Sequence, residues 1–263
     1  VQMATRAFAG HDYLAAVRGA ELPAFDLGAE PESAATAILA SPPERVVDVD
    51  WRIDAFDDLR LLDHAVVAQS FYDLGAAAIP HGLELDGRQH GASADLAIVR
   101  LTDAAGQAPA DALGFADPFP DDYAVLVTAV AWYPEQHQVG DDVPTALFDA
   151  IWVRRDLADA GAPIAPPLSP PRNLRASATD LSWDPPALGT PDLYEVDVYP
   201  LASAGGATTA RAATRLEVRD GTSVRIPATL LDPDAAGFVF RVAAVATAPE
   251  AWASTQSGVI LTP

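Results

Sequence analysis

Apolar and polar residues alternate strictly along several stretches of the chain, beginning near Glu44. In the stretch RVVDVDWRID, Val47, Val49, Trp51 and Ile53 fall on one face, and Asp or Arg occupies each position between them. A period of two residues is typical of a strand with one buried face and one face in water. Similar runs predict further strands at 59–72, 82–87, 94–102, 121–133 and 145–155. Six strands with no convincing helix between them predict an antiparallel β-sandwich.

The last two of these runs have the form of one long hairpin. They are separated by PEQHQVGDDVP, which has proline at both ends and a Gly-Asp-Asp turn. Two alternating runs joined by a loop with turn residues indicate antiparallel partners.

The first 43 residues are ambiguous. The stretch HDYLAAVRGAEL (11–22) has the form of a short helix capped by Asp12, and PESAATAILA (31–40) has the form of another, entered at Pro31. Helices this short need packing partners to be stable. Strand and coil therefore stay open as alternatives for both stretches.

A proline-rich stretch divides the chain. LADAGAPIAPPLSPPR (157–172) contains five prolines, which favour an extended, semi-rigid spacer. We therefore predict two β-sandwich domains in tandem, at 44–157 and 171–263, joined by a linker at 158–170. The segment 1–43 is left without an assigned structure.

The second domain contains a series of strand-like segments in a specific order: PPRNL, ATDLSWDPP, DLYEVDVY, TRLEVRD, TSVRIPATLLDP, GFVFRVAAVAT and STQSGVILTP. The positions that carry the pattern are Pro171, Leu174, Leu181, Trp183, Tyr194, Val196, Val198, Val224, Ile226, Leu231, Pro233, Phe238, Phe240 and Val242. Over residues 170–263 this spacing resembles the fibronectin type III family. The resemblance implies a sandwich of seven strands in two sheets, with Trp183 in the core.

Two features depart from that family or from its adhesive members. Phe238 stands where the family usually has a tyrosine, at a spacing one residue longer, so the corner hydroxyl bond is missing or replaced. The chain has no Arg-Gly-Asp; the order at 219–221 is Arg-Asp-Gly, which indicates a turn. Integrin-type adhesion therefore receives no support.

The amino-acid composition limits the classes of partner that the protein is expected to bind. Half of the residues are hydrophobic, and 37 acidic residues outnumber 16 basic ones, all of them Arg, for a net charge of −21. Such a charge keeps a protein soluble and repels nucleic acid and anionic membranes. Cysteine is absent, which excludes disulfides, Cys-ligated zinc and thiol nucleophiles. We expect protein partners or self-assembly and no nucleic-acid binding.

Apolar runs and the N-terminus of the sequence bear on the cellular location of the protein. No apolar run approaches the roughly 20 residues that span a bilayer, so we expect no transmembrane segment. The chain begins at Val1, which is consistent with removal of a signal peptide or with a lipid anchor upstream. A secreted or cell-surface location is the expectation.

No catalytic motif is evident. The five histidines form no HxH or HExxH pair, GASAD at 91–95 is not a GxSxG elbow, and no GxGxxG or P-loop occurs. We therefore expect neither an enzyme nor a bound cofactor. An active site in the N-terminal domain, built from carboxylates in a cleft, is a remaining hypothesis.

Paired aspartates are the weak candidates for a calcium site, because Ca²⁺ prefers several carboxylate oxygens. The pairs beside the long hairpin are Asp121 with Asp122 and Asp141 with Asp142. Solvation of turns is the alternative explanation for them. Further acidic pairs occur at Asp48 and Asp50 and at Asp232 and Asp234.

Two hypotheses for function follow. The first is a non-catalytic extracellular or cell-surface β-sandwich protein that acts as an adhesion, spacer or assembly module, for example in a surface appendage or layer. The second is a carbohydrate- or peptide-binding accessory module of a secreted enzyme. Exposed aromatic side chains at Trp132, Tyr133 and Trp252 would favour the second hypothesis, and buried ones the first.

Overall fold

Antiparallel strands make up most of the computed structural model, together with one α-helix, so the chain is all-β in class. In the part of the chain that the structure describes, no helix is long and apolar enough to span a membrane. The described residues are 2–8, 11–20, 38–41, 44–63, 67–78, 83–85, 88–90, 94–102, 112–117, 124–134, 137–138, 144–145, 149–159, 161–177, 179–204, 207–210, 213–257 and 260–261.

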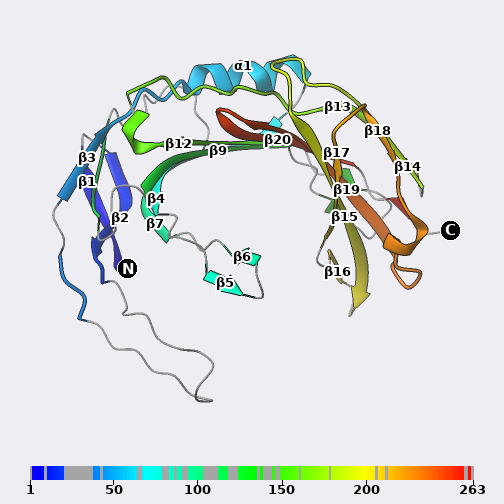
Figure 1. The fold of residues 1–263 in the computed structure, drawn as a ribbon, viewed down its shortest axis with the longest axis horizontal. Coiled ribbons are helices and arrows are strands. Elements are labelled where there is room, and N and C mark those ends of the chain that lie inside the picture. Colours follow the sequence, from blue (N-terminus) through cyan, green and yellow to red (C-terminus); the bar gives the residue numbers. More distant parts are fainter. Residues whose placement is uncertain are drawn as a thin grey trace.

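One 12-stranded sheet runs through the molecule from its N-terminal to its C-terminal half. Its main path, in spatial order, is β1 (Gln2–Phe8), β2 (His11–Arg18), β7 (Ala94–Thr102), β4 (Val67–Ala78), β9 (Ala124–Pro134), β12 (Asp149–Asp156), β20 (Glu250–Gln256), β19 (Gly237–Thr247), β15 (Leu193–Ala204) and β16 (Ala207–Ala210). Off this path, β17 (Thr214–Val218) pairs with β15, and β21 (Ile260–Leu261) pairs with β19. The sheet bends, with β1 and β2 at one end and β15 and β16 at the other (Figure 1).

The strand β2 corrects the helical alternative for 11–22. The buried Tyr13 and Ala15 alternate with the exposed Asp12 and Leu14, so the period of two residues prevails over helix propensity. The predicted cap Asp12 is therefore a strand residue. Most of the second ambiguous stretch, 31–40, lies outside the described residues.

A second small layer covers this end of the sheet. It pairs β3 (Glu44–Asp48) with β8 (Ala112–Ala116), and β8 contacts β2, β7 and β1. The Tyr13 hydroxyl fixes the two layers together, because it donates to the Gly114 carbonyl at 2.6 Å and accepts from the Gly114 amide at 2.8 Å. The strands β1 and β8 were not predicted from the sequence.

The helix α1 (Ile53–Asp63) corrects two sequence predictions. The strand predicted to contain Ile53 ends at Asp48, and the strand predicted at 59–72 begins only at Val67. The buried faces explain the error, since Phe56 and Leu59 are three residues apart and fall on one side of a helix. Tyr72 of β4 donates a hydrogen bond to Asp57, and α1 lies over the middle of the large sheet (Figure 1).

Other predicted elements are confirmed. Val47, Val49 and Trp51 are buried as the alternation predicted, and β7 spans the whole predicted strand at 94–102. The long hairpin is formed by β9 and β12, which pair antiparallel from Val125 opposite Asp156 to Trp132 opposite Asp149. Two short ladders complete this half: β5 (Leu83–Leu85) with β6 (Arg88–His90), and β10 (His137–Gln138) with β11 (Pro144–Thr145).

The C-terminal half contains two facing layers. A three-stranded sheet of β13 (Arg172–Ala176), β14 (Asp180–Asp184) and β18 (Ser223–Arg225) lies opposite the end of the large sheet. Trp183 of β14 is 2% exposed, and its ring meets Tyr194 of β15 edge-on at 5.2 Å. The prediction that Trp183 is a core residue is confirmed. Two short 3₁₀ turns occur at η2 (Leu157–Asp159) and η3 (Ala228–Leu230).

The proline-rich stretch is packed against both halves. Ile164 forms a bridge with Trp51, in which the Ile164 amide donates to the Asp50 carbonyl at 2.7 Å and the Arg52 amide donates to the Ile164 carbonyl at 3.0 Å. The Ser169 hydroxyl accepts hydrogen bonds from the Ala187 and Leu188 amides at 2.8 and 3.1 Å. This stretch therefore forms hydrogen bonds with residues on both sides of it in the sequence.

Gly189 makes that packing feasible. Its φ of +79° lies in the left-handed region, and a Cβ at this position would stand 2.1 Å from the Pro167 carbonyl oxygen. Only glycine meets both requirements.

Candidate functional site: the junction of β12 and β20

The two halves of the chain meet as neighbouring strands of one sheet. Residues Ala150 to Val153 of β12 lie opposite Ser254 to Ala251 of β20 in antiparallel register. β12 also pairs with β9, and β20 also pairs with β19, so both strands are interior strands of the sheet. Backbone hydrogen bonds therefore continue from the N-terminal half into the C-terminal half.

Side chains at this junction separate onto the two faces of the sheet. Ile151 and Val153 are buried, and they lie opposite the buried Ala253 and Ala251. These residues belong to one hydrophobic cluster that also contains Trp51 and Phe56 from one half and Trp183 and Phe240 from the other. The apolar core is therefore shared by both halves.

The opposite face carries a pair of tryptophans. Trp152 of β12 and Trp252 of β20 lie directly opposite each other, and both are half-buried. Arg241 of β19 places its guanidinium carbon 4.8 Å from the centre of the Trp252 ring and 5.5 Å from that of Tyr199. Such contacts are attractive because the face of an aromatic ring is electron-rich.

Arg241 also belongs to a charged row across three strands. Asp197 of β15 lies opposite Arg215 of β17 on one side and Arg241 on the other. Arg215 Nε donates to Asp197 Oδ1 at 2.8 Å, and Arg241 Nε donates to Asp197 Oδ2 at 3.0 Å. Asp197 is only 2% exposed, so its charge is compensated almost entirely by these two arginines.

The electrostatics of Asp197 follow from this geometry. Burial alone raises the pKa of the carboxyl group, but the hydrogen bonds from Arg215 and Arg241 and their positive charges outweigh it and lower the pKa below its ordinary value. Directly before β15, the pKa of Asp192 is also lowered, because the Thr247 hydroxyl and amide donate to its carboxylate at 2.7 and 2.8 Å.

A pH dependence of stability is expected from Asp197. At pH values above its unfolded pKa of about 3.9, Asp197 is ionised in both states and its stabilisation is complete. As the pH falls below this value towards the lower folded pKa, the unfolded state binds the proton first, and stability declines. Urea unfolding at pH 5 and at pH 3 gives the free energy of unfolding at each pH. Its decrease from pH 5 to pH 3 should be smaller for Asp197→Asn than for the wild type. Equal losses would contradict the prediction.

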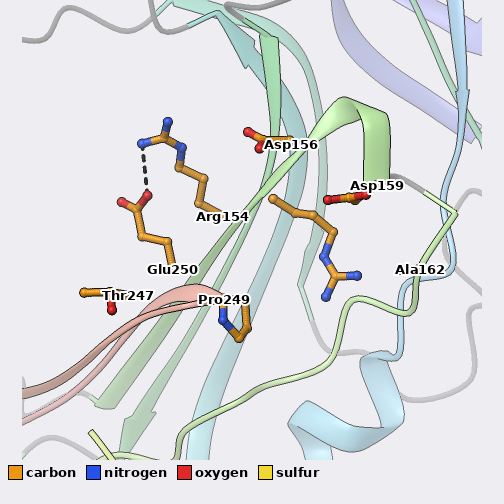
Figure 2. Close-up of a pocket in the computed structure, with 8 residues that line it drawn as sticks. Arg154, Asp156, Asp159, Ala162, Thr247, Pro249 and Glu250 are labelled. Atoms are coloured by element: carbon orange, nitrogen blue, oxygen red, sulfur yellow. Dashed lines mark ion pairs between the residues drawn. The ribbon is translucent and has the colours of Figure 1, made fainter. Parts of the chain in front are cut away.

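A cleft of about 460 Å³ lies at one edge of the junction, between the end of β12 and the turn that joins β19 to β20 (Figure 2). Arg154 of β12 and Glu250 of β20 form an ion pair across it at 3.1 Å. The rest of the lining is Arg155, Asp156, Asp159, Ala162, Thr247 and Pro249. Both halves of the chain therefore contribute to the cleft, and a salt bridge joins them there.

The cleft is lined mainly by charged side chains. Its one hydroxyl, that of Thr247, already donates to Asp192. Within the described ranges, no group of three or more His, Asp or Glu residues converges as metal ligands.

The predicted calcium candidates Asp121, Asp122, Asp141 and Asp142 all lie outside the described residues. In each of the other acidic pairs, one aspartate side chain has a local partner. Asp50 forms an ion pair with Arg52 at 2.7 Å, and Asp232 accepts the amide of Asp234 at 2.9 Å, as in a turn. The side chains of the five histidines are also outside the described part.

The aromatic candidates have different positions. Trp132 is buried in the core, Trp252 is half-buried beneath Arg241, and the side chain of Tyr133 lies outside the described part. The sequence alone does not identify Trp152 and Arg154 as junction residues. Their signal was present in the alternation of DAIWVRR, but nothing in that pattern identifies β20 as the neighbouring strand.

Comparison with known proteins adds no identification. No family model matches the chain, and no curated protein matches it at a significant level.

Proposed function

We propose that this chain is a non-catalytic extracellular or cell-surface β-sandwich protein that acts as a rigid spacer or assembly module. The observation that carries the proposal is the antiparallel pairing of β12 with β20. A chain built from separate domains on a flexible linker transmits little orientation from one domain to the next. Here two interior strands and a shared core join the halves, which suits a protein that holds its two ends at a fixed distance.

We also propose that residues 170–263 form a fibronectin type III-like sandwich, the second of two tandem domains. Support comes from the strand order. The first, second and fifth strands of the pattern correspond to β13, β14 and β18 in one layer, and the other layer has the order β20, β19, β15 and β17. Trp183 and Tyr194 pack together between the layers. The last long strand of this layer, β20, pairs with β12 on its other side.

The surface charge is compatible with an extracellular structural role. A net charge of −21 with no lysine favours solubility and disfavours contact with nucleic acid. Structural contact with other proteins would then depend on those parts of the surface that are not acidic.

The alternative, a carbohydrate- or peptide-binding accessory module, would need an open aromatic platform. Of the three aromatics considered for it, Trp132 is in the core and Trp252 has the guanidinium of Arg241 over its ring. Trp152 is half-buried beside Trp252 and is the residue that favours this alternative most. The pairing of β12 with β20 and the shared core involve more of the described residues than an aromatic platform would. The structural role is therefore preferred.

A continuous sheet and a shared core predict one cooperative unfolding transition. Scanning calorimetry of the full chain should give a single peak whose calorimetric and van't Hoff enthalpies agree. In Trp152→Pro, which removes an amide from an interior strand, that peak should split or shift down, whereas Trp152→Ala retains the strand backbone and should keep a single peak. Two separate transitions in the wild type would contradict a rigid junction.

A further inference from the structure

The outer edge of β1 is the least protected sheet edge in the described part of the molecule. β1 has seven residues, QMATRAF, and pairs only with β2 there. Natural proteins protect exposed edges with proline, charged side chains, bulges, very short strands or a covering helix or loop. Between Gln2 and Phe8, β1 has no proline and only one charged residue, Arg6, and its one register shift lies at its very start, between Gln2 and Met3.

Four other edge strands are protected in these ways. β16 has four residues and β18 has three. β13 has a register shift between Arg172 and Arg175, and Asn173 within it has a φ of +49°. β17 carries charged side chains, and Arg215 and Arg219 on or beside it form ion pairs. The contrast marks β1 as the edge that is suited to pair with another strand.

Exposed apolar side chains gather at the same end of the molecule. Four of the five large apolar residues that are well exposed in the described part occur within the first 46 residues: Leu14 at 42%, Ile38 at 89%, Leu39 at 45% and Val46 at 53%. Leu14 is on β2, Val46 is on β3, and the segment of Ile38 and Leu39 is bridged to the end of β2 through Ala40 and Gly19. β3 is in turn tied to β1 by the ion pair of Arg6 with Glu44 at 2.7 Å. Apolar surface that collects in one region marks interaction sites.

Charge at this end opposes contact with another copy less than the net charge of the chain does. Two acidic copies repel each other through a net charge of −21 each. The hairpin of β1 and β2 is an exception, since it contains two arginines, Arg6 and Arg18, against one aspartate, Asp12. Contact between copies at this hairpin therefore meets less repulsion than contact elsewhere.

We propose that the outer edge of β1 pairs with β1 of a second copy, antiparallel and across a two-fold axis at Thr5, so that two large sheets join into one. This inference rests on the proposed assembly role and specifies its interface. Residues that lie opposite each other on neighbouring strands point to the same face of a sheet. The two-fold axis must therefore place one residue opposite its own copy, and it cannot lie between two consecutive positions of the strand. An axis at Arg6 would set two arginines opposite each other, and one at Ala4 would draw the register shift into the ladder. An axis at Thr5 places Thr5 opposite Thr5 and Arg6 opposite Ala4.

Analytical ultracentrifugation of the full chain at physiological salt tests this interface. The wild type should be a dimer at high concentration. Thr5→Asp should weaken dimerisation at least about tenfold, because two carboxylates then lie opposite each other, and Thr5→Arg should do the same with two cations. An equimolar mixture of the two variants should restore a dimer that contains one copy of each. Thr209→Asp on β16, at the other end of the sheet, is the matched control and should leave dimerisation unchanged.

The mixture separates a lost interface from a misfolded variant, because misfolded chains do not rescue each other. A monomeric wild type, a dimer insensitive to Thr5→Asp, or a mixture that stays monomeric would overturn the proposal. If the wild type is a monomer that unfolds in a single transition, the proposed β1 interface is wrong and the proposed rigid junction still stands.

Discussion

Replacing Trp183 with alanine is expected to lower the free energy of unfolding by about 3–5 kcal/mol. The indole is 2% exposed, meets Tyr194 edge-on at 5.2 Å, and belongs to the cluster that extends across the β12–β20 junction. Its removal leaves a cavity that the surrounding strands cannot fill, because they are held by hydrogen bonds on both sides. Chemical denaturation followed by circular dichroism measures the effect.

The matched control is Leu188→Ala, which truncates a large apolar side chain that is well exposed. Its cost should be within about 0.5 kcal/mol. If Trp183→Ala and Leu188→Ala cost the same, Trp183 does not hold the core of the C-terminal half, and the fibronectin type III-like assignment fails with it.

Asp197→Ala is expected to destabilise the protein by about 1.5–3 kcal/mol, the usual range for hydrogen bonds to charged groups, because Asp197 is buried but Arg215 is half exposed and keeps Glu195 as a partner. The substitution leaves Arg215 and Arg241 facing each other across β15 without the carboxylate between them. Arg241 would also be less firmly held over Trp252, next to the junction. Denaturant unfolding at pH 7 measures the loss.

Glu217→Ala provides the comparison for that loss. Glu217 pairs with Arg219 at 3.2 Å, but both side chains are exposed, so the pair should contribute only about 0–1 kcal/mol. A cost for Asp197→Ala no larger than that for Glu217→Ala would show that Asp197 is not a buried, charge-compensated residue.

Alternation of apolar and polar residues predicted the all-β class and the hairpin of β9 with β12, because a half-buried strand imposes a period of two residues on its own sequence. It failed at 53–63, where Phe56 and Leu59 follow a helical spacing inside a segment flanked by strands. The tryptophan core at Trp183 was predictable because it belongs to a longer pattern of spacings. Each of these predictions needed only local sequence.

The junction could not be predicted in the same way. Pairing of β12 with β20 joins residues about a hundred positions apart, and the alternation in each strand fixes its buried face but not its neighbour. The proline-rich stretch illustrates the same limit. Its prolines correctly indicate extended backbone, but only the tertiary structure shows that Ile164 and Ser169 pack and form hydrogen bonds with residues on either side.

Distance measurement between spin labels on the two halves tests the rigid junction most directly. The chain has no cysteine, so Asp48→Cys on β3 and Ser223→Cys on β18, both at exposed positions, accept one label each. The Thr5→Asp background should be used so that contact between copies does not contribute, with Glu217→Cys and Ser223→Cys as a reference pair within one half. A rigid junction predicts a single distance distribution for the first pair that is about as narrow as that of the reference pair. A broad or multiple distribution for the first pair alone would show that the halves move independently and would contradict the proposed function.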